Sequence, residues 1–375
     1  AVVSDCMTQL YANPSSPHSA GESARDALNA ARRRVAGLIG ALSGEIVFTS
    51  GATESNNLAI RGLTKTLKGR GDLTRNRILT STIEHKSVTK TAKAAESDGF
   101  EHKAIPVDAT GRIDMTALDE MIDEKTILVS VQAANNEIGT VQPISEVSGI
   151  AHSNGAYVHC DAAQALGRIA IDVNEWDVDL LSLSAHKAYG PKGIGVLYCA
   201  GGPNSVPVSA LQYGGGQESG LSPGTQNIPG IVGFGEACRI IAEVFDREVT
   251  KLRRLRDQFE ERVLDEISES VVVGSKKHRL PSTTNIHFPG LEAEAILARM
   301  PSVALSTGSA CESGAPEPSH VLQAIGLSRE AAYECIRVAV GRYTTSGDID
   351  QSTEMLTETV ADIRQTMAMK SAPTQ

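Results

Sequence analysis

Two apolar strands with a polar tip between them are encoded in Asp179-Leu-Leu-Ser-Leu-Ser-Ala-His-Lys-Ala-Tyr-Gly-Pro-Lys-Gly-Ile-Gly-Val-Leu-Tyr198. The tip is Ser-Ala-His-Lys, and a Gly-Pro turn separates it from the returning strand. Lys187 is thus expected at the end of a buried strand, where an ammonium group is costly unless it is neutralised or paired. One solution is a Schiff base to an aldehyde cofactor such as pyridoxal phosphate (PLP). The alternative is a surface lysine on a hairpin, and this segment alone leaves both open.

Strands and helices alternate along most of the chain, which predicts a largely parallel sheet covered by helices. The predicted strands are 45–49, 77–81, 127–131, 156–160, 180–185 and 194–198, and the predicted helices are 23–39, 53–62, 87–98 and 144–154. A long amphipathic helix over 231–269 is followed by the strands 282–288 and 335–340 and the helix 318–324. We therefore expect an α/β fold with a large domain over 13–243 and a small α+β domain over 244–375 that includes 1–12.

The composition excludes some classes of function. The 375 residues carry a formal net charge of −10, which argues against direct nucleic-acid binding, since phosphate contacts need clustered Lys and Arg. No apolar run approaches the roughly 18 residues that span a bilayer, and no signal peptide opens the chain. We expect a cytoplasmic protein without membrane contact.

The six cysteines are scattered and form no C-x-x-C pair, so neither a disulfide framework nor a zinc site is expected. Five of them, Cys6, Cys160, Cys199, Cys238 and Cys335, are expected to be small buried hydrophobes. Cys311 differs because it lies in the segment 306–318, which is too rich in Gly, Ser and Pro for a helix or strand interior. A thiol on such a loop is accessible and able to ionise.

Polar residues follow several predicted strands, at the sheet edge where open α/β sheets bind ligands. Thr53 follows the first strand in a small-residue turn whose backbone N–H groups would suit a phosphate, although any such turn favours Ser, Gly and Thr. His85 follows the second strand, where a lone histidine is also common as a structural residue. Asp161 follows an apolar strand and needs a cationic partner, such as a protonated pyridine nitrogen. Gln164, one turn further on, could donate to the ring's phenolic oxygen.

Ordered motifs run from Asn13-Pro-Ser-Ser-Pro-His18 to Arg342-Tyr-Thr-Thr345: Thr49-Ser-Gly-Ala-Thr-Glu-Ser-Asn-Asn57, Glu84-His-Lys-Ser-Val88, Asn135-Asn-Glu-Ile-Gly-Thr-Val-Gln142, His159-Cys-Asp-Ala-Ala-Gln164, Ser184-Ala-His-Lys187, Gly214-Gly-Gly-Gln217, Gly224-Thr225, Ser309-Ala-Cys311 and Ile336-Arg-Val-Ala-Val-Gly-Arg342. In these motifs the chain resembles a cysteine desulfurase of the NifS/IscS-like branch of the class V aminotransferase family. The resemblance implies a fold type I PLP enzyme with a mostly parallel seven-stranded sheet in its large domain.

The resemblance also implies how PLP would be held. Lys187 would form the imine with PLP and move protons at the substrate's α-carbon, and His85 would stack on the ring and assist proton transfer. Asp161 would pair with the pyridine nitrogen and Gln164 with the phenolic oxygen. The phosphate would be bound by Thr53, Ser184 and His186, joined by Thr225 from a second subunit, so a homodimer is expected. Ala52 would also contact the cofactor.

The implied substrate is L-cysteine. Asn136, which would also contact the cofactor, and Arg337 would hold its carboxylate, because a guanidinium binds two oxygens at once. Arg342, the alternative carboxylate partner, is expected to be structural. The Cys311 thiolate would attack the substrate's sulfur, which leaves a persulfide on Cys311, releases L-alanine and prepares the sulfur for a protein acceptor or scaffold.

The chain departs from the family in the segment after Gly214-Gly-Gly-Gln217-Glu218. The family usually has arginines flanking the Gly-Leu pair there, whereas this chain has Ser219 and Ser222. The departure suggests a specialised subgroup, and the acceptor pathway is open among iron–sulfur cluster assembly, tRNA thiolation and DNA phosphorothioation. Two other functions compete with the desulfurase: a selenocysteine lyase or class V aminotransferase, and a sulfur-pathway scaffold without turnover.

Overall fold

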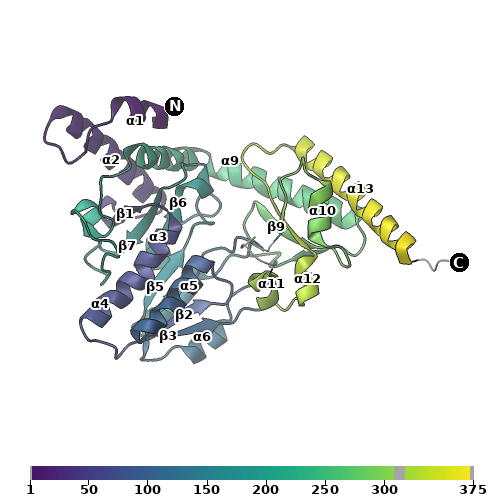
Figure 1. The fold of residues 1–375 in the computed structure, drawn as a ribbon, viewed down its shortest axis with the longest axis horizontal. Coiled ribbons are helices and arrows are strands. Elements are labelled where there is room, and N and C mark those ends of the chain that lie inside the picture. The colour runs from purple at the N-terminus through teal and green to yellow at the C-terminus, as the bar shows by residue number, and fades with distance from the viewer. Residues whose placement is uncertain (1, 308–316, 372–375) are drawn as a thin grey trace. The chain divides into compact units, whose positions relative to one another are not determined.

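The computed structural model describes residues 2–307 and 317–371, which form two compact units (Figure 1). The first unit comprises the chain up to residue 106 together with 113–133 and 142–245. The second comprises 107–112, 134–141 and the chain from 246 onward. Each unit has its own apolar core, so each can be described by itself.

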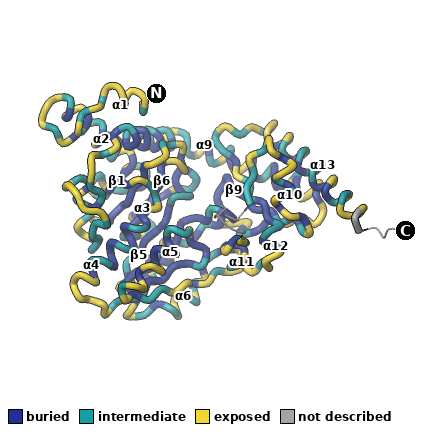
Figure 2. The backbone as a smooth tube through the Cα atoms, in the orientation of Figure 1, coloured by how far each residue is buried: buried dark blue, intermediate teal, exposed yellow. Residues whose placement is uncertain are grey.

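The first unit is built on a seven-stranded sheet with the order β1-β7-β6-β5-β4-β2-β3. Its strands are β1 (Ile46–Thr49), β2 (Arg77–Ser81), β3 (Glu101–Ile105), β4 (Thr126–Ser130), β5 (Tyr157–Asp161), β6 (Leu180–Ser184) and β7 (Gly195–Cys199). All run in one direction except β7, which is antiparallel to both neighbours. The expected mostly parallel sheet and the returning strand after Lys187 are confirmed. Strands β4 and β6 are buried along their whole length, as a helix-covered parallel sheet requires. Figure 2 shows the interior of this unit mostly in dark blue, the colour of buried residues.

The helices of the first unit are α1 (Val2–Gln9), α2 (Ser19–Leu38), α3 (Ala52–Asn57), α4 (Leu63–Gly69), α5 (Lys86–Ala94), α6 (Met115–Met121), α7 (Ile144–Ser153) and α8 (Val173–Trp176), with the short turns η1 (Ser43–Glu45), η2 (Leu58–Gly62), η3 (Ala95–Asp98), η4 (Ala185–Ala188) and η5 (Gln217–Gly220). Side chains cap several of them. Asp114 accepts from the backbone N–H groups at the start of α6, and Asp172 does the same for α8. The helix predicted over 53–62 continues through η2, a π-turn, into α4.

The second unit contains a four-stranded antiparallel sheet with the order β10-β11-β9-β8. Its elements are β8 (Val271–Val273), β9 (Thr283–His287), β10 (Ser306–Thr307), β11 (Cys335–Ala339), α10 (Ala293–Arg299), α11 (His320–Ala324), α12 (Arg329–Tyr333) and α13 (Ser346–Ser371). The expected α+β character of this part is confirmed. Over 2–307 and 317–371, no helix combines the length and the low polarity that crossing a membrane demands.

The 39-residue helix α9 (Ile228–Glu266) contributes to both cores. Its first part places Phe234 and Ile241 in the core of the first unit, and its second part places Leu252 and Phe259 in the core of the second. The boundary therefore falls inside the helix, between residues 245 and 246, two residues after the expected position.

The units differ from the expected domains at two other places. Residues 1–12 group with the first unit and not with the second, because Cys6 of α1 is buried and Leu10 packs against the first core. The segment 134–141 groups with the second unit, where Gly139 accepts a backbone hydrogen bond from Leu280 at 2.8 Å. Sequence pattern did not indicate either exchange, because both depend on contacts between distant segments.

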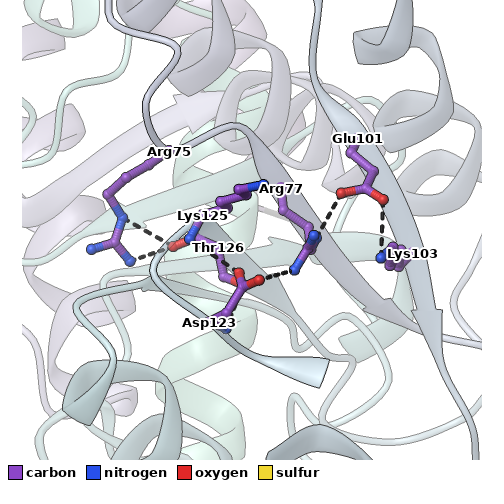
Figure 3. A network of polar contacts seen from close by, with 7 residues as sticks. All are labelled: Arg75, Arg77, Glu101, Lys103, Asp123, Lys125 and Thr126. Carbon is purple, nitrogen blue, oxygen red and sulfur yellow. Dashed lines mark hydrogen bonds and ion pairs between the residues drawn. The ribbon is translucent and has the colours of Figure 1, made fainter. Parts of the chain in front are cut away.

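The amino ends of β2, β3 and β4 are joined by a polar network (Figure 3). Arg77, the first residue of β2, pairs with Glu101 of β3 (Nε to Oε2, 2.7 Å) and with Asp123, which precedes β4. Arg75 donates to the backbone carbonyl of Thr126, the first residue of β4. These contacts tie strand starts together, so this edge of the sheet has a structural use.

At the opposite edge, one glycine lets two strand ends approach each other. Gly195, the first residue of β7, pairs with Thr49 of β1 on one side and with Ser184 of β6 on the other. A Cβ atom on Gly195 would lie 2.5 Å from the Cα of Gly51 and 2.6 Å from the Leu183 carbonyl oxygen. Only glycine fits there, because both obstructing atoms belong to the backbone.

We expect Gly195→Ala to destabilise the protein by about 1–3 kcal/mol, because the turn after β1 must move away from β6. Chemical denaturation followed by circular dichroism measures this change. The control is Gly149→Ala in α7, where an added Cβ meets nothing within 4 Å; it should leave stability unchanged or raise it by up to about 1 kcal/mol. Equal stability of the two variants would contradict the packing argument.

Candidate active site

The carboxyl ends of β1, β2, β5 and β6 lie at one edge of the first unit's sheet, because these strands share a direction. Gly195 brings the turn after β1 against the end of β6, so that a Cβ on Gly51 would be 3.8 Å from Ser184 Oγ. Ala52 and Thr53 then open α3, and Thr53 is exposed. Four of the strand ends that the sequence predicted to converge are therefore at a common edge.

Lys187 lies in η4, directly after β6. Ser184 Oγ is 2.9 Å from His186 Nδ1, which joins two of the predicted phosphate ligands. His186 and Lys187 are exposed residues that follow the buried strand β6. The chain turns sharply after Lys187, with Tyr189 at φ +62°. The pKa of His186 is lowered, first by partial burial and then by the charge of Lys187.

Asp161 ends β5, which is the strand next to β6 in the sheet. Its carboxylate is buried and accepts two hydrogen bonds: from Asn56 Nδ2 to Oδ2 at 2.8 Å and from the Ala163 N–H to Oδ1 at 3.0 Å. Both donors are neutral, so a protonated ring nitrogen would suit this carboxyl group as a cationic partner. Gln164 follows in the next turn and is half-buried.

His85 caps the amino end of α5, and its ring is exposed. Its Nδ1 is 2.7 Å from Ser87 Oγ and accepts from the Ser87 N–H at 3.1 Å. Ser87 Oγ in turn accepts from Asn56 Nδ2 at 2.8 Å. Asn56 thereby connects the imidazole of His85 to the carboxylate of Asp161.

Glu84 is completely buried beside this edge. Its Oε1 accepts from Ser81 Oγ at 2.5 Å and from the Gln132 N–H at 2.9 Å, while Gln132 Nε2 donates to the Ile83 carbonyl. Burial raises the pKa of Glu84 to about 8, the two hydrogen bonds oppose the shift, and the charge of Asp161 adds to it. Glu84 is thus mostly protonated at neutral pH. Its hydrogen bond to the Gln132 N–H ties the segment before His85 to the residues that follow β4.

The segment 217–225, which contains Ser219 and Ser222, contacts the turn after β1. Ser222 Oγ donates to Glu54 Oε1 at 3.0 Å, and Glu54 Oε2 accepts from both the N–H and the hydroxyl of Ser50. Ser219 has φ +58°, which side chains rarely adopt. Thr225 is exposed at the end of this segment.

The buried carboxylate of Glu218 anchors the same segment. It forms a two-point ion pair with Arg32 at 2.6 and 2.8 Å and accepts from the Phe48 N–H of β1 at 2.9 Å. The ion pair fixes the left-handed backbone of Glu218, whose φ is +50°.

The two predicted substrate ligands lie in the second unit. Arg337 of β11 donates to the Asn136 carbonyl at 3.2 Å and to Ser306 Oγ at 3.0 Å. Arg342 pairs instead with the buried Glu248 (Nε to Oε2, 2.7 Å), which agrees with a structural role. Cys311, the predicted sulfur acceptor, lies outside the described residues.

The first unit therefore gathers at one sheet edge an amine, a buried carboxylate, two imidazoles and several hydroxyls. These groups come from Lys187, Asp161, His85, His186, Ser184 and Thr53. Their chemistry matches the parts of PLP: an aldehyde for the amine, a ring nitrogen for the carboxylate and a phosphate for the hydroxyls. The residues present fit this cofactor.

Sequence analysis missed three side chains that organise the site: Asn56, Ser87 and Glu84. All three stand inside the motifs that carried the family resemblance, so the motifs pointed to the right segments. Their roles were hidden because each acts through a neighbour, and the contacts join α3, α5 and β5, which are far apart in the sequence.

Comparison with known proteins gives consistent matches. The family model described as aminotransferase class-V matches residues 1–351. The chain is 44% identical over 360 residues to a cysteine desulfurase IscS 1 of Archaeoglobus fulgidus, covering 96% of this chain and 92% of that protein. A solved NifS-like protein matches with a TM-score of 0.88 at 34% identity, covering 96% of this chain and 94% of that one. A structure of SspA in complex with cysteine matches with a TM-score of 0.80 at 37% identity, covering 92% and 95%.

We expect Glu84→Gln to flatten the pH dependence of stability. The folded pKa of Glu84 is raised to about 8, so the wild-type free energy of unfolding should fall as pH rises from about 5 to about 8, by on the order of a few kcal/mol. Glutamine imitates the protonated acid and keeps the acceptor for Ser81 and Gln132. Urea unfolding at several pH values measures the slope. The exposed Glu96→Gln variant should keep the wild-type slope, and the same slope in Glu84→Gln would refute this account.

Proposed function

This chain belongs to the aminotransferase class-V family and is a homologue of cysteine desulfurases, and we propose that it is a PLP-dependent cysteine desulfurase that stores the sulfur of L-cysteine as a persulfide on Cys311. The carrying observation is the placement of Lys187, His85 and Asp161 at one edge of the sheet. In the proposed net reaction, the Cys311 thiol and L-cysteine give the Cys311 persulfide and L-alanine. One carbon–sulfur bond breaks and one sulfur–sulfur bond forms.

Bound PLP supplies an aldehyde for the substrate's amino group and a ring that stabilises negative charge at the α-carbon. In our proposal the Lys187 amine holds the cofactor and carries protons to and from that carbon. Asp161 keeps the ring nitrogen protonated, since a buried carboxylate binds a cation strongly. His85 covers the ring face and exchanges a proton. Gln164 donates to the phenolic oxygen.

The remaining residues bind and orient. Ala52, Thr53, Ser184 and His186 hold the phosphate, and Thr225 of a second copy completes this site in a homodimer. Arg337 holds the substrate's carboxylate at two points, together with Asn136, which also faces the cofactor. The contacts of Arg337 with Ser306 and with the Asn136 carbonyl support this role, because they orient the guanidinium.

The persulfide is then passed to a protein acceptor or scaffold, and nucleic acid does not bind this chain directly. A cytoplasmic location is consistent with the five cysteines outside 308–316, which are free and buried. The acceptor belongs to iron–sulfur cluster assembly, tRNA thiolation or DNA phosphorothioation. Capture of the protein that receives labelled sulfur from Cys311 identifies which.

We expect Cys311→Ala to lower alanine release from L-cysteine at least about 100-fold while the absorbance of bound PLP stays unchanged, because the nucleophile acts after the cofactor is loaded. Lys187→Ala should lose both the activity and the absorbance of the lysine adduct. Amino-acid analysis and visible spectroscopy measure the two. Alanine release that survives Cys311→Ala would instead identify a lyase, and a 2-oxo acid formed in place of alanine would identify an aminotransferase.

We expect Arg337→Lys to raise KM for L-cysteine about 10–100-fold with a smaller change in kcat, because lysine cannot bind a carboxylate at two points. Steady-state kinetics measure the split. The matched control is Arg342→Lys, which can keep an ion pair with Glu248 and should leave KM unchanged. A larger KM effect at position 342 would reverse the assignment of the two arginines.

A further inference from the structure

A chain of hydrogen bonds leads from the buried carboxylate of the site to the imidazole. Asp161 Oδ2 accepts from Asn56 Nδ2, the same nitrogen donates to Ser87 Oγ, and Ser87 Oγ contacts His85 Nδ1. The three distances are 2.8, 2.8 and 2.7 Å. Asp161 ends β5, Asn56 lies in α3, Ser87 lies in α5, and His85 is the residue that caps the amino end of α5.

The carboxylate of Asp161 decides which group is the donor in its hydrogen bond with Asn56. An ionised carboxylate has only acceptors, so the NH₂ group of Asn56, and not its carbonyl, must face Asp161. With the amide reversed, two acceptors would oppose each other in a buried place. The observed orientation leaves Asn56 Oδ1 without a partner in the described part of the chain, and in exchange both N–H bonds of the amide are used.

The donor direction of the Asn56 bond also decides which role the Ser87 hydroxyl takes towards His85. Ser87 Oγ has one proton and already accepts from Asn56, so its O–H is available for His85 Nδ1. The backbone N–H of Ser87 points to the same ring nitrogen, since His85 caps α5. The Ser87 hydroxyl and the Ser87 backbone N–H thus both point at Nδ1 of His85. Nδ1 must therefore act as an acceptor and carries no proton.

We propose that Asn56 and Ser87 are positioning residues that fix His85 as the tautomer with its proton on Nε2. Neither residue touches substrate in this assignment, because each acts through His85. The exposed edge of the ring then presents an N–H, and His85 enters the reaction as a donor. This last consequence rests on the proposed function, whereas the tautomer itself does not.

The test is solid-state ¹⁵N NMR of histidine-labelled holoenzyme, which distinguishes protonated from unprotonated ring nitrogens. A His85→Gln variant assigns the signals. In the wild type, Nε2 of His85 should be protonated, and Nδ1 should be unprotonated and hydrogen-bonded. A proton on Nδ1 would overturn the proposal.

Variants then test the two positioning residues. Ser87→Ala and Asn56→Leu should both move the Nδ1 signal towards that of a nitrogen with fewer hydrogen bonds, and Ser87→Thr should restore it. The control is Ser97→Ala, because the hydroxyl of Ser97 donates to the Ala94 carbonyl and takes no part in the chain of hydrogen bonds to His85. An unchanged Nδ1 signal in Ser87→Ala would also overturn the proposal.

Activity supplies a separate readout. Ser87→Ala should lower kcat for L-cysteine about tenfold with little change in KM, since the proton transfer of His85 is weakened rather than removed, and Ser87→Thr should recover it. If the tautomer is as proposed but the wild type releases no alanine from L-cysteine, the proposed function fails and the positioning assignment stands. If alanine is released but Nδ1 of His85 is protonated, the positioning assignment fails and the proposed function stands.

Discussion

The hydrogen bond between Asn56 and Asp161 is the interaction on which the rest of the candidate site depends. Asn56 belongs to the helix that opens at the predicted phosphate turn, and Asp161 ends the strand that would face the ring nitrogen. Through Ser87 the same amide reaches His85. One buried side chain therefore connects three groups to which the proposed function assigns different parts of a single cofactor. Because both residues are buried, water cannot replace the bond cheaply.

Polar groups that stabilise the sheet and polar groups of the candidate active site lie at opposite edges of the sheet. At the amino ends of β2, β3 and β4, Arg77 forms ion pairs with Glu101 and Asp123, and these ion pairs link the starts of the strands. At the carboxyl ends, Lys187 and His186 are exposed, and the donors to Asp161 within 2–307 and 317–371 are neutral. Parallel strands produce this division, because all of their carboxyl ends lie on one side.

The segment that carries Thr225 is held by contacts with distant parts of the chain. Arg32 forms an ion pair with the buried Glu218, and Ser222 donates to Glu54. The positive charge of the pair comes from a helix that is distant in sequence. The left-handed backbone at Glu218 and Ser219 persists because these contacts compensate for its strain.

Local pattern was sufficient for the strands β1, β2 and β4 to β7, because their apolar runs are bounded by turn residues and lie inside a covered sheet. It was not sufficient for β3, an edge strand whose Glu101-His-Lys segment is polar and partly exposed. It also placed residues 1–12 in the other unit. Each of these errors concerns a contact or an exposure that local sequence does not encode.

The family, the sheet and the positions of Lys187, Asp161 and His85 could all be stated from the order of residues, since chemical groups at strand ends leave a linear signal. The direction of the hydrogen bonds from Asp161 to His85 could not, and neither could the protonation of Glu84 nor the clearance at Gly195. Those features arise where segments that are far apart in the sequence meet. Gly195 lies against Gly51, and Asn56 bonds Asp161, which is 105 residues further along the chain. Only folding brings such atoms within reach of one another.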